Sequence, residues 1–259
     1  MKEFSAKYPI VFGAALVLVS LFAATPIALL LTAIGVAEPL ASGIARLVIA
    51  AVLIALFRDE LSWENAGTGL RWALPALGFV AWNVIYYCVG GAEPVGGAAL
   101  VGAFVVALSS AILEELIFRG ILIPRLRANG ESARWSLWAS TLLFCLAQLS
   151  NALSLTMGDF IVELGYTLAI GLLFGAVYLK TGDLASVMGA HLLVNLSGQV
   201  FATHPSVGVA WVYVLFFALV AGVGYYSLRI AKGIDEADGK GAGKGKLNAS
   251  KGAGGQAKA

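Results

Sequence analysis

Two adjacent glutamates, Glu114 and Glu115, stand in an otherwise apolar run, and Arg119 follows four residues after the second. Residues four apart on an α-helix share one face, so Glu115 and Arg119 can form an ion pair that offsets much of the cost of burying them. Glu114 points about 100° away and lacks that partner. An unpaired carboxylate in apolar surroundings is suited to take a proton from water, which makes Glu114 a candidate general base. A carboxylate cluster at a helix end near water is the purely structural alternative.

A second polar pair, His191 and Asn195, has the same spacing of four residues on a later apolar segment. Imidazole and amide groups on one helix face can donate hydrogen bonds to negative charge that develops on an oxygen. The same pair can equally form hydrogen bonds between packed membrane helices. Both interpretations remain open from the sequence.

Two further polar residues occur singly in apolar segments. Gln148 is a lone amide, which in a membrane helix serves either packing or chemistry. Arg46 is expected to extend its charged end toward the membrane surface or to pair with an acidic residue. A charge at mid-bilayer costs about 2.5–3.5 kcal/mol on insertion scales, so such charges need partners or a function. An acid pair, a glutamine and a His/Asn pair on separate segments together predict one shared, water-accessible polar cavity.

Long apolar segments must hold these residues in place. Of the 259 residues, 59% are hydrophobic and 12% are charged, whereas soluble domains average about 25% charged residues. A bilayer is spanned by about 20 apolar residues in a helix. Segments long enough for this lie at about residues 10–35, 40–57, 71–90, 97–118, 135–155, 160–180, 184–202 and 207–230. We therefore expect an all-α fold, a polytopic membrane helix bundle of about eight transmembrane helices.

The distribution of basic residues predicts the orientation of this bundle. Lysines and arginines lie at one end of the segments: Lys2, Lys7, Arg58, Arg71, Arg119, Arg125, Arg127, Arg134, Lys180, Arg229 and Lys232. The opposite loops, near residues 36–40, 91–96, 156–159 and 203–206, contain no lysine or arginine. By the positive-inside rule, both termini are expected in the cytoplasm. Glu114 and His191 then fall in the cytoplasmic half of the membrane, and Gln148 lies somewhat deeper.

The chain divides into a bundle and a tail. Residues 1–238 are expected to form the transmembrane helical bundle. Residues 239–259 consist mainly of Gly, Ala and Lys and have almost no apolar surface to bury, so they are expected to form a disordered cytoplasmic tail. The net charge of +2 gives no indication of nucleic-acid binding. Cys88 and Cys145 both lie in apolar runs, so no disulfide framework is expected.

The polar motifs, in this order on separate helices, resemble the signature of the CPBP family of intramembrane proteases, which includes CAAX prenyl endopeptidases, Abi proteins and bacteriocin-immunity-type members. The family patterns are EExxxR, FxxxH and HxxxN or HxxxD. The chain has EELIFR at Glu114–Arg119, FCLAQ at Phe144–Gln148 and HLLVN at His191–Asn195. In the second motif Gln148 replaces the histidine of the family pattern. The resemblance covers about residues 97–200.

The resemblance implies an endopeptidase that hydrolyses a peptide bond near the cytoplasmic membrane face. Glu114 would activate the attacking water, and Glu115 and Arg119 would form the supporting ion pair. His191 and Asn195 would bind the oxyanion or hold the water. The expected partners are membrane lipid and a peptide or membrane-protein substrate, with no nucleic acid. The expected location is a prokaryotic plasma membrane, with the chain as a multi-pass integral protein.

Gln148 bears on the cofactor and on activity. In the implied site it would help Glu114 to position the water or a metal ion. The family is often described as metal-dependent, which would imply a divalent metal such as zinc, but glutamine is a poor zinc ligand, and a glutamate-activated water needs no cofactor. An alternative is a catalytically impaired pseudoprotease that acts as a membrane binding or immunity protein. A transporter or proton relay built on the two glutamates is a third hypothesis.

Overall fold

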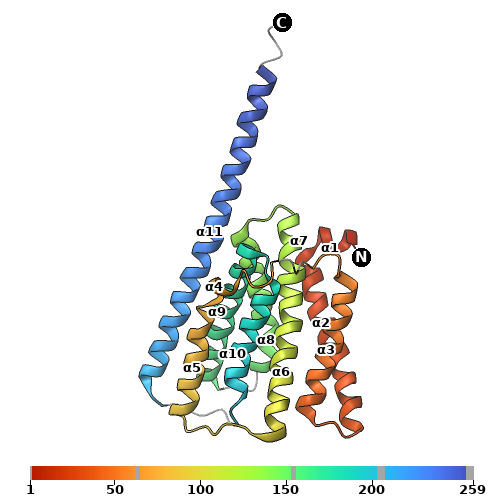
Figure 1. The fold of residues 1–259 in the computed structure, drawn as a ribbon, viewed down its shortest axis with the longest axis vertical. Helices are drawn as coiled ribbons and strands as arrows, with labels where there is room; N and C mark the ends of the chain where they lie inside the picture. The colour runs from red at the N-terminus through yellow and green to blue at the C-terminus, as the bar shows by residue number, and fades with distance from the viewer. Residues whose placement is uncertain (1, 62, 64, 153–155, 203–207, 255–259) are drawn as a thin grey trace.

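The computed structural model describes residues 2–61, 63, 65–152, 156–202 and 208–254. Within these ranges the protein is helical, with one isolated β-bridge between Pro94 and Phe201. The elements in chain order are α1 (Lys2–Lys7), α2 (Pro9–Ala33), α3 (Glu38–Phe57), α4 (Leu70–Ala73), α5 (Ala76–Val89), α6 (Gly97–Glu115), the π-helical segment η1 (Leu116–Leu122), α7 (Ile123–Ala128), α8 (Ala133–Ala152), α9 (Met157–Thr181), α10 (Leu184–Gln199) and α11 (Ala210–Gly254). The predicted all-α membrane bundle is confirmed (Figure 1).

Each predicted apolar segment corresponds to a helical rod, with α4 and α5 forming one rod and α6, η1 and α7 another. Among the described residues, five rods are long and apolar enough to cross a membrane: Pro9–Ala33, Glu38–Phe57, Gly97–Ala128, Met157–Thr181 and Ala210–Gly239. Of the remaining helices, α5 with 14 residues and α10 with 16 are shorter, and α8 is more polar. α8 and α10 carry Gln148 and His191, which line a cavity inside the bundle.

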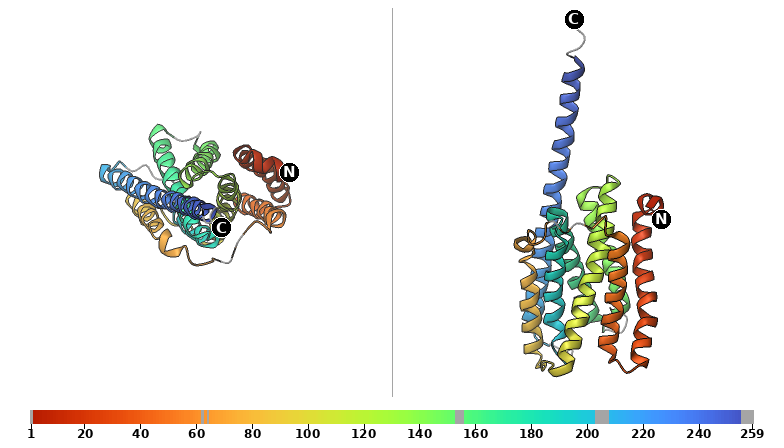
Figure 2. Two further views of the ribbon diagram at one scale, coloured as in Figure 1. Left: turned by 90° about the horizontal axis from the view of Figure 1, so that it is seen from above. Right: turned by 45° about the vertical axis from the view of Figure 1, so that its right-hand side comes forward.

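The helices that bear the polar motifs lie in the middle of the bundle. α6 packs against α3 and α10, and α9 packs against α8 and α11. α2 and α11 flank the bundle on opposite sides (Figures 1 and 2). Only 6% of the apolar window of α2 is buried inside the protein. The outer helices therefore offer apolar surface to lipid, and the inner ones position the motifs.

The two ends of the bundle differ in what they carry. α1 and the projecting part of α11 lie at one end, called here the terminal end (Figure 1). The loops at residues 34–37 and 90–96 lie at the other, called here the distal end. α1 and the projecting part of α11 therefore lie at the same end of the bundle, as an orientation with both termini on one side of the membrane requires. The predicted loop at 203–206 lies outside the described residues, and the cytoplasmic placement of the termini remains a prediction.

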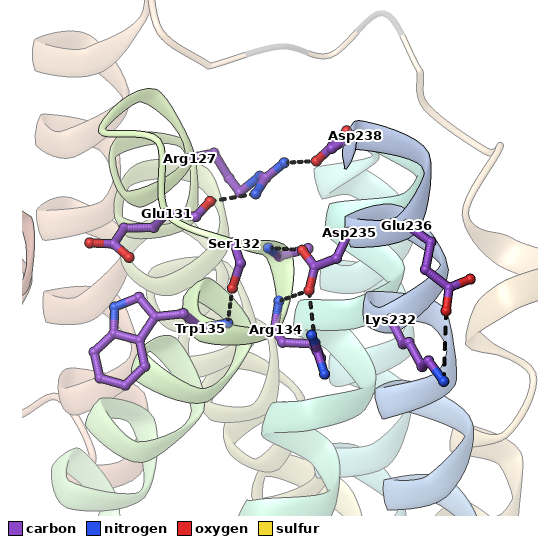
Figure 3. A network of polar contacts seen from close by, with 10 residues as sticks. Arg127, Glu131, Ser132, Arg134, Trp135, Lys232, Asp235, Glu236 and Asp238 are labelled. Atoms are coloured by element: carbon purple, nitrogen blue, oxygen red, sulfur yellow. Dashed lines mark hydrogen bonds and ion pairs between the residues drawn. The ribbon is translucent and has the colours of Figure 1, made fainter. Parts of the chain in front are cut away.

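α11 is fixed to the terminal end by ion pairs (Figure 3). Asp235 accepts hydrogen bonds from the Ala133 N–H at 2.6 Å and from Arg134 Nε at 2.9 Å. Arg127 pairs with Asp238 in the next turn. Because Ala133 is the first residue of α8, the Asp235 carboxylate also lies at the positive end of the α8 dipole. These contacts connect the last helix to the loop between α7 and α8.

Past these contacts the structure continues α11 as a helix through Gly254. The disordered tail expected for residues 239–259 stays a prediction. Residues 255–259 lie outside the described residues. The domain boundary at residue 238 remains a prediction.

Asp183 joins three parts of the terminal end. Its carboxylate accepts hydrogen bonds from the Ser186 N–H at 2.9 Å, from the Ser186 hydroxyl, and from the Gly69 N–H at 2.8 Å. It is thus the N-cap of α10 and also holds the loop before α4. Burial alone would raise the pKa of Asp183, but the hydrogen bonds from Ser186 and Gly69 outweigh it and hold the pKa below its usual range.

We expect Asp183→Asn to lower the free energy of unfolding by about 1–2 kcal/mol at neutral pH. The pKa of Asp183 is lower in the folded than in the unfolded state, so its stabilisation is complete above about pH 4 and is lost as pH falls through the folded value. The difference from wild type should therefore shrink toward about pH 3. Thermal unfolding in detergent checks this, with the exposed Asp59→Asn as control. An equal difference at both pH values would contradict the assignment.

Candidate active site

The two adjacent glutamates face different surroundings. Both end α6, where it continues directly into η1. The Glu114 side chain is 24% exposed, whereas that of Glu115 is fully buried. Consecutive helix positions differ by about 100°, so one carboxylate reaches a cavity while its neighbour enters the protein interior.

Glu115 lies at the centre of a buried charge network. Its Oε1 atom is 2.7 Å from Arg119 Nη1 and 2.7 Å from His191 Nδ1. Arg119 Nη2 also donates to the backbone oxygen of Gly171 at 3.0 Å. The structure therefore places the expected Glu115–Arg119 ion pair, and it adds an imidazole contact to the same carboxylate oxygen.

Three phenylalanine rings surround the buried guanidinium. The carbon at the centre of the Arg119 guanidinium lies 5.0 Å from the ring centroid of Phe144, 5.9 Å from that of Phe118 and 6.0 Å from that of Phe174. These distances are within the range of favourable cation–π contacts. Phe144 opens the FCLAQ segment, so this motif residue packs against the cation of the first motif.

His191 connects the buried network to Glu114. Because the Glu115 carboxylate can only accept, Nδ1 of His191 is assigned as the protonated nitrogen, which leaves Nε2 as an acceptor. Nε2 lies 3.7 Å from Glu114 Oε2, too far for a direct hydrogen bond. A water molecule beside these two atoms can bond both of them. His191 is almost fully buried, so its orientation is fixed by Glu115.

A cavity of about 290 Å³ lies against this arrangement. The side chains of Glu114, Gln148, His191 and Asn195 line it together, from helices α6, α8 and α10. Gln148 also hydrogen-bonds the carboxylate of Glu114. The structure thus brings together the predicted residues of all three motifs. Glu115 and Arg119 lie behind the cavity wall rather than on it.

Arg46 lies on the same cavity, a position that the sequence did not predict. Its Nη1 donates to Ser110 Oγ at 2.8 Å, and Ser110 precedes Glu114 by one helical turn. Its charge also acts on the Glu114 carboxylate. Its charged end therefore borders the cavity rather than the membrane surface, and pairing with an acidic residue stays a prediction. Ser110 and Glu114 are four residues apart on one face of α6, and this spacing is the sequence signal that could have indicated a polar partner for Arg46 on the cavity.

Glu163 is a second carboxylate on the cavity that sequence reasoning missed. It lies on α9, and the Thr167 hydroxyl donates to its Oε1 at 3.4 Å. The signal for it was an acidic residue near the start of an apolar span. The other polar lining residues not predicted are Ser110, Tyr166, Thr167 and Gln199.

The donor set does not fit a metal centre. Among the described residues, no group of three or more His, Cys, Asp or Glu side chains comes together in a way that could hold an ion. His191 uses Nδ1 on Glu115, so the cavity offers one imidazole nitrogen with the carboxylates of Glu114 and Glu163, and these do not come together as a ligand group. The amides of Gln148 and Asn195 are poor zinc ligands.

The central part of the chain is similar to known proteins. Residues 96–197 match the family model of the Rce1-like type II CAAX prenyl endopeptidases. CAAX prenyl protease 2 of Arabidopsis thaliana is 30% identical over 100 residues, which make up 34% of this chain and 31% of that protein. The match therefore spans about a third of the length of this curated relative. No solved structure gives a significant match. The matched segment contains every predicted site residue and agrees with the extent expected from the motifs.

Proposed function

We propose that this integral membrane protein, whose residues 96–197 match the Rce1-like family model, is an intramembrane endopeptidase of the CPBP family. Glu114 is the base that activates water for attack on a peptide bond. The main observation behind this proposal is that Glu114 Oε2 lies 3.7 Å from His191 Nε2, on a cavity that Gln148 and Asn195 also line. The substrate is a peptide or membrane-protein segment, and the membrane is a prokaryotic plasma membrane.

The first step is the attack of water on the scissile carbonyl carbon. His191 Nε2 accepts one hydrogen bond from the water, and the Glu114 carboxylate takes the other proton as the new C–O bond forms. Gln148, which bonds Glu114, fixes the direction in which that carboxylate faces. The Glu115–Arg119 pair keeps the His191 ring in the required orientation from behind.

The second step is the collapse of the tetrahedral intermediate. Its negative oxygen needs hydrogen-bond donors, and the Asn195 amide and the Arg46 guanidinium are the available donors on the cavity wall. The proton held by Glu114 passes to the leaving nitrogen as the C–N bond breaks. The products are a carboxylic acid and an amine, and Glu114 returns to its ionised form.

The direct test is cleavage by purified protein in liposomes with a panel of fluorogenic peptides, with cut sites read by mass spectrometry. Cleavage by wild type that depends on Glu114 supports the proposal. The competing function is a pseudoprotease that binds a membrane partner, and the observation that favours it is Gln148 in place of the histidine of the family pattern. Wild-type protein that is folded but cleaves no peptide in the panel favours this second function.

Gln148→His is expected to raise turnover about 10- to 100-fold, because an imidazole beside Glu114 adds a group that can donate a proton to the leaving amine. An amide cannot do this. The measurement is kcat on one cleaved peptide at several pH values, where the variant should gain a new titration near neutral pH. Gln148→Ala serves as control and should lower turnover. A histidine variant no faster than wild type would show that Gln148 is adapted to its own role.

A further inference from the structure

Two exposed cations share one indole ring at the terminal end of the bundle. The guanidinium carbon of Arg71 lies 5.4 Å from the ring centroid of Trp72, and Lys180 Nζ lies 5.5 Å from the same centroid. Both distances are within the range of favourable cation–π contacts. Arg71 and Trp72 belong to α4, whereas Lys180 is in the last turn of α9. Arg71 and Lys180 are called here the cation pair.

The fold holds the two helices of the cation pair together. Asp183 follows Lys180 by three residues and accepts a hydrogen bond from the Gly69 N–H at 2.8 Å. Gly69 directly precedes α4. From the other side, the Tyr226 hydroxyl of α11 donates to the backbone oxygen of Trp72 at 3.2 Å. In Figure 1, α4 lies at the terminal end of the bundle. The position of the cation pair is therefore set by contacts among three helices.

The cation pair is not neutralised by a neighbouring acid. The ion pairs of the terminal end use other cations, which are Arg58, Arg125, Arg127, Arg134 and Lys232. Within the described ranges, neither Arg71 nor Lys180 takes part in an ion pair. Like charges held close together repel each other, so an anion bound beside both of them relieves that repulsion. The surface around Trp72 is thus suited to a negatively charged ligand.

An apolar surface begins beside the cation pair. Leu70, Leu74 and Leu77 are each more than half exposed, and they are called here the leucine stripe. Their spacing of four and three residues puts them on one side of the rod formed by α4 and α5. This rod runs from Arg71 toward the distal end, and Leu70 directly precedes Arg71 in the chain. A ligand with an anionic head and an apolar tail matches both surfaces.

We propose that the cation pair and the ring of Trp72 bind the headgroup phosphate of an anionic phospholipid, whose acyl chains lie along the leucine stripe. Phosphate is an anion that arginine and lysine both bind well. Tryptophan rings are enriched at the level of the headgroups, because they combine an apolar body with a polar edge. The positive-inside rule predicts that the terminal end is cytoplasmic, and the cytoplasmic leaflet carries anionic lipid. The site lies on a different surface from the catalytic cavity and does not depend on the proposed function.

The test is lipid binding to the purified full-length chain in detergent, followed by native mass spectrometry as phosphatidylglycerol or phosphatidylcholine is added. Both lipids carry a phosphate, but the ammonium of phosphatidylcholine cancels its charge. Wild type should bind the first phosphatidylglycerol about 10- to 30-fold more tightly than phosphatidylcholine, and the double variant Arg71→Gln with Lys180→Gln should lose this preference. Lys180→Gln alone should lower the affinity about 3- to 5-fold, which provides a reading if the double variant is unstable. Equal affinity of wild type for the two lipids would overturn the proposal.

The matched control is the double variant Arg58→Gln with Lys232→Gln. It removes one exposed arginine and one exposed lysine from the same end, so its change in charge is identical. It should keep the preference for phosphatidylglycerol, and an equal loss in both double variants would mean that general surface charge, rather than this site, attracts the lipid. Glycerol phosphate has the headgroup without the tails and should leave the lipid bound. Displacement of the lipid by an excess of glycerol phosphate would overturn a lipid ligand in favour of a soluble phosphate.

Discussion

Replacement of Glu114 by alanine is expected to lower kcat for peptide cleavage by about 100- to 10,000-fold, the usual contribution of a general base. The Glu114 carboxylate lies 3.7 Å from His191 Nε2 on the cavity side. Without it, the attacking water has no carboxylate positioned to accept its proton, and the leaving amine has no acid positioned to donate that proton. Glu114→Gln, which keeps the shape and the contact with Gln148, should lose nearly as much. The measurement is initial rate on one peptide in liposomes.

The matched control for this loss is Glu163→Gln. Glu163 is a carboxylate on the same cavity, but it lies on α9 with Thr167 as its neighbour. Its removal should change kcat by less than about 10-fold, since it has no part in the proton transfer. If Glu114→Ala cleaves like wild type while remaining folded, the glutamate mechanism is wrong, whatever the effect at Glu163.

Arg119→Met is expected to destabilise the protein by about 3–5 kcal/mol, because it leaves the Glu115 carboxylate without its cation in a fully buried position. The change also removes the hydrogen bond to the Gly171 oxygen and the contacts with the phenylalanine rings. Methionine matches the length of the arginine stem, so packing loss contributes little. The measurement is unfolding in mixed micelles with increasing denaturing detergent.

Two companion variants define the cause of that loss. Arg58→Met removes a cation whose pair with Asp59 is largely exposed, and it should cost less than about 1 kcal/mol. Combining Arg119→Met with Glu115→Gln should recover part of the stability, because the stranded charge is then absent. A loss at Arg119 no greater than that at Arg58 would mean that the buried pair contributes little.

Most of the helical architecture follows from the lengths of the apolar runs. The lengths of the apolar runs do not indicate where a rod is interrupted or widened. The rod breaks between α4 and α5 at Pro75, which lacks a backbone N–H and is the sequence signal for that break. The π-helical segment η1, all of whose residues are buried, has no comparable signal. Run lengths also do not give the number of helices that can cross a membrane by themselves, since inner helices need not be apolar on every face.

The site was predicted in part. The spacing of four residues in each pair, together with the cost of polar groups in lipid, is enough to expect Glu114, Gln148, His191 and Asn195 on one cavity. The contact of His191 with Glu115 was not foreseen, since nothing local distinguishes which of two adjacent carboxylates an imidazole on another helix will meet. The position of Arg46 on the cavity was not foreseen for the same reason, because its serine partner lies on a different helix.

The placement of both chain ends has a practical consequence for work on this protein. A reporter or affinity tag fused after α11 or before α1 lies across the bundle from the loops at residues 34–37 and 90–96, so it leaves the distal end clear. A protein that binds the projecting part of α11 would likewise approach from the terminal end.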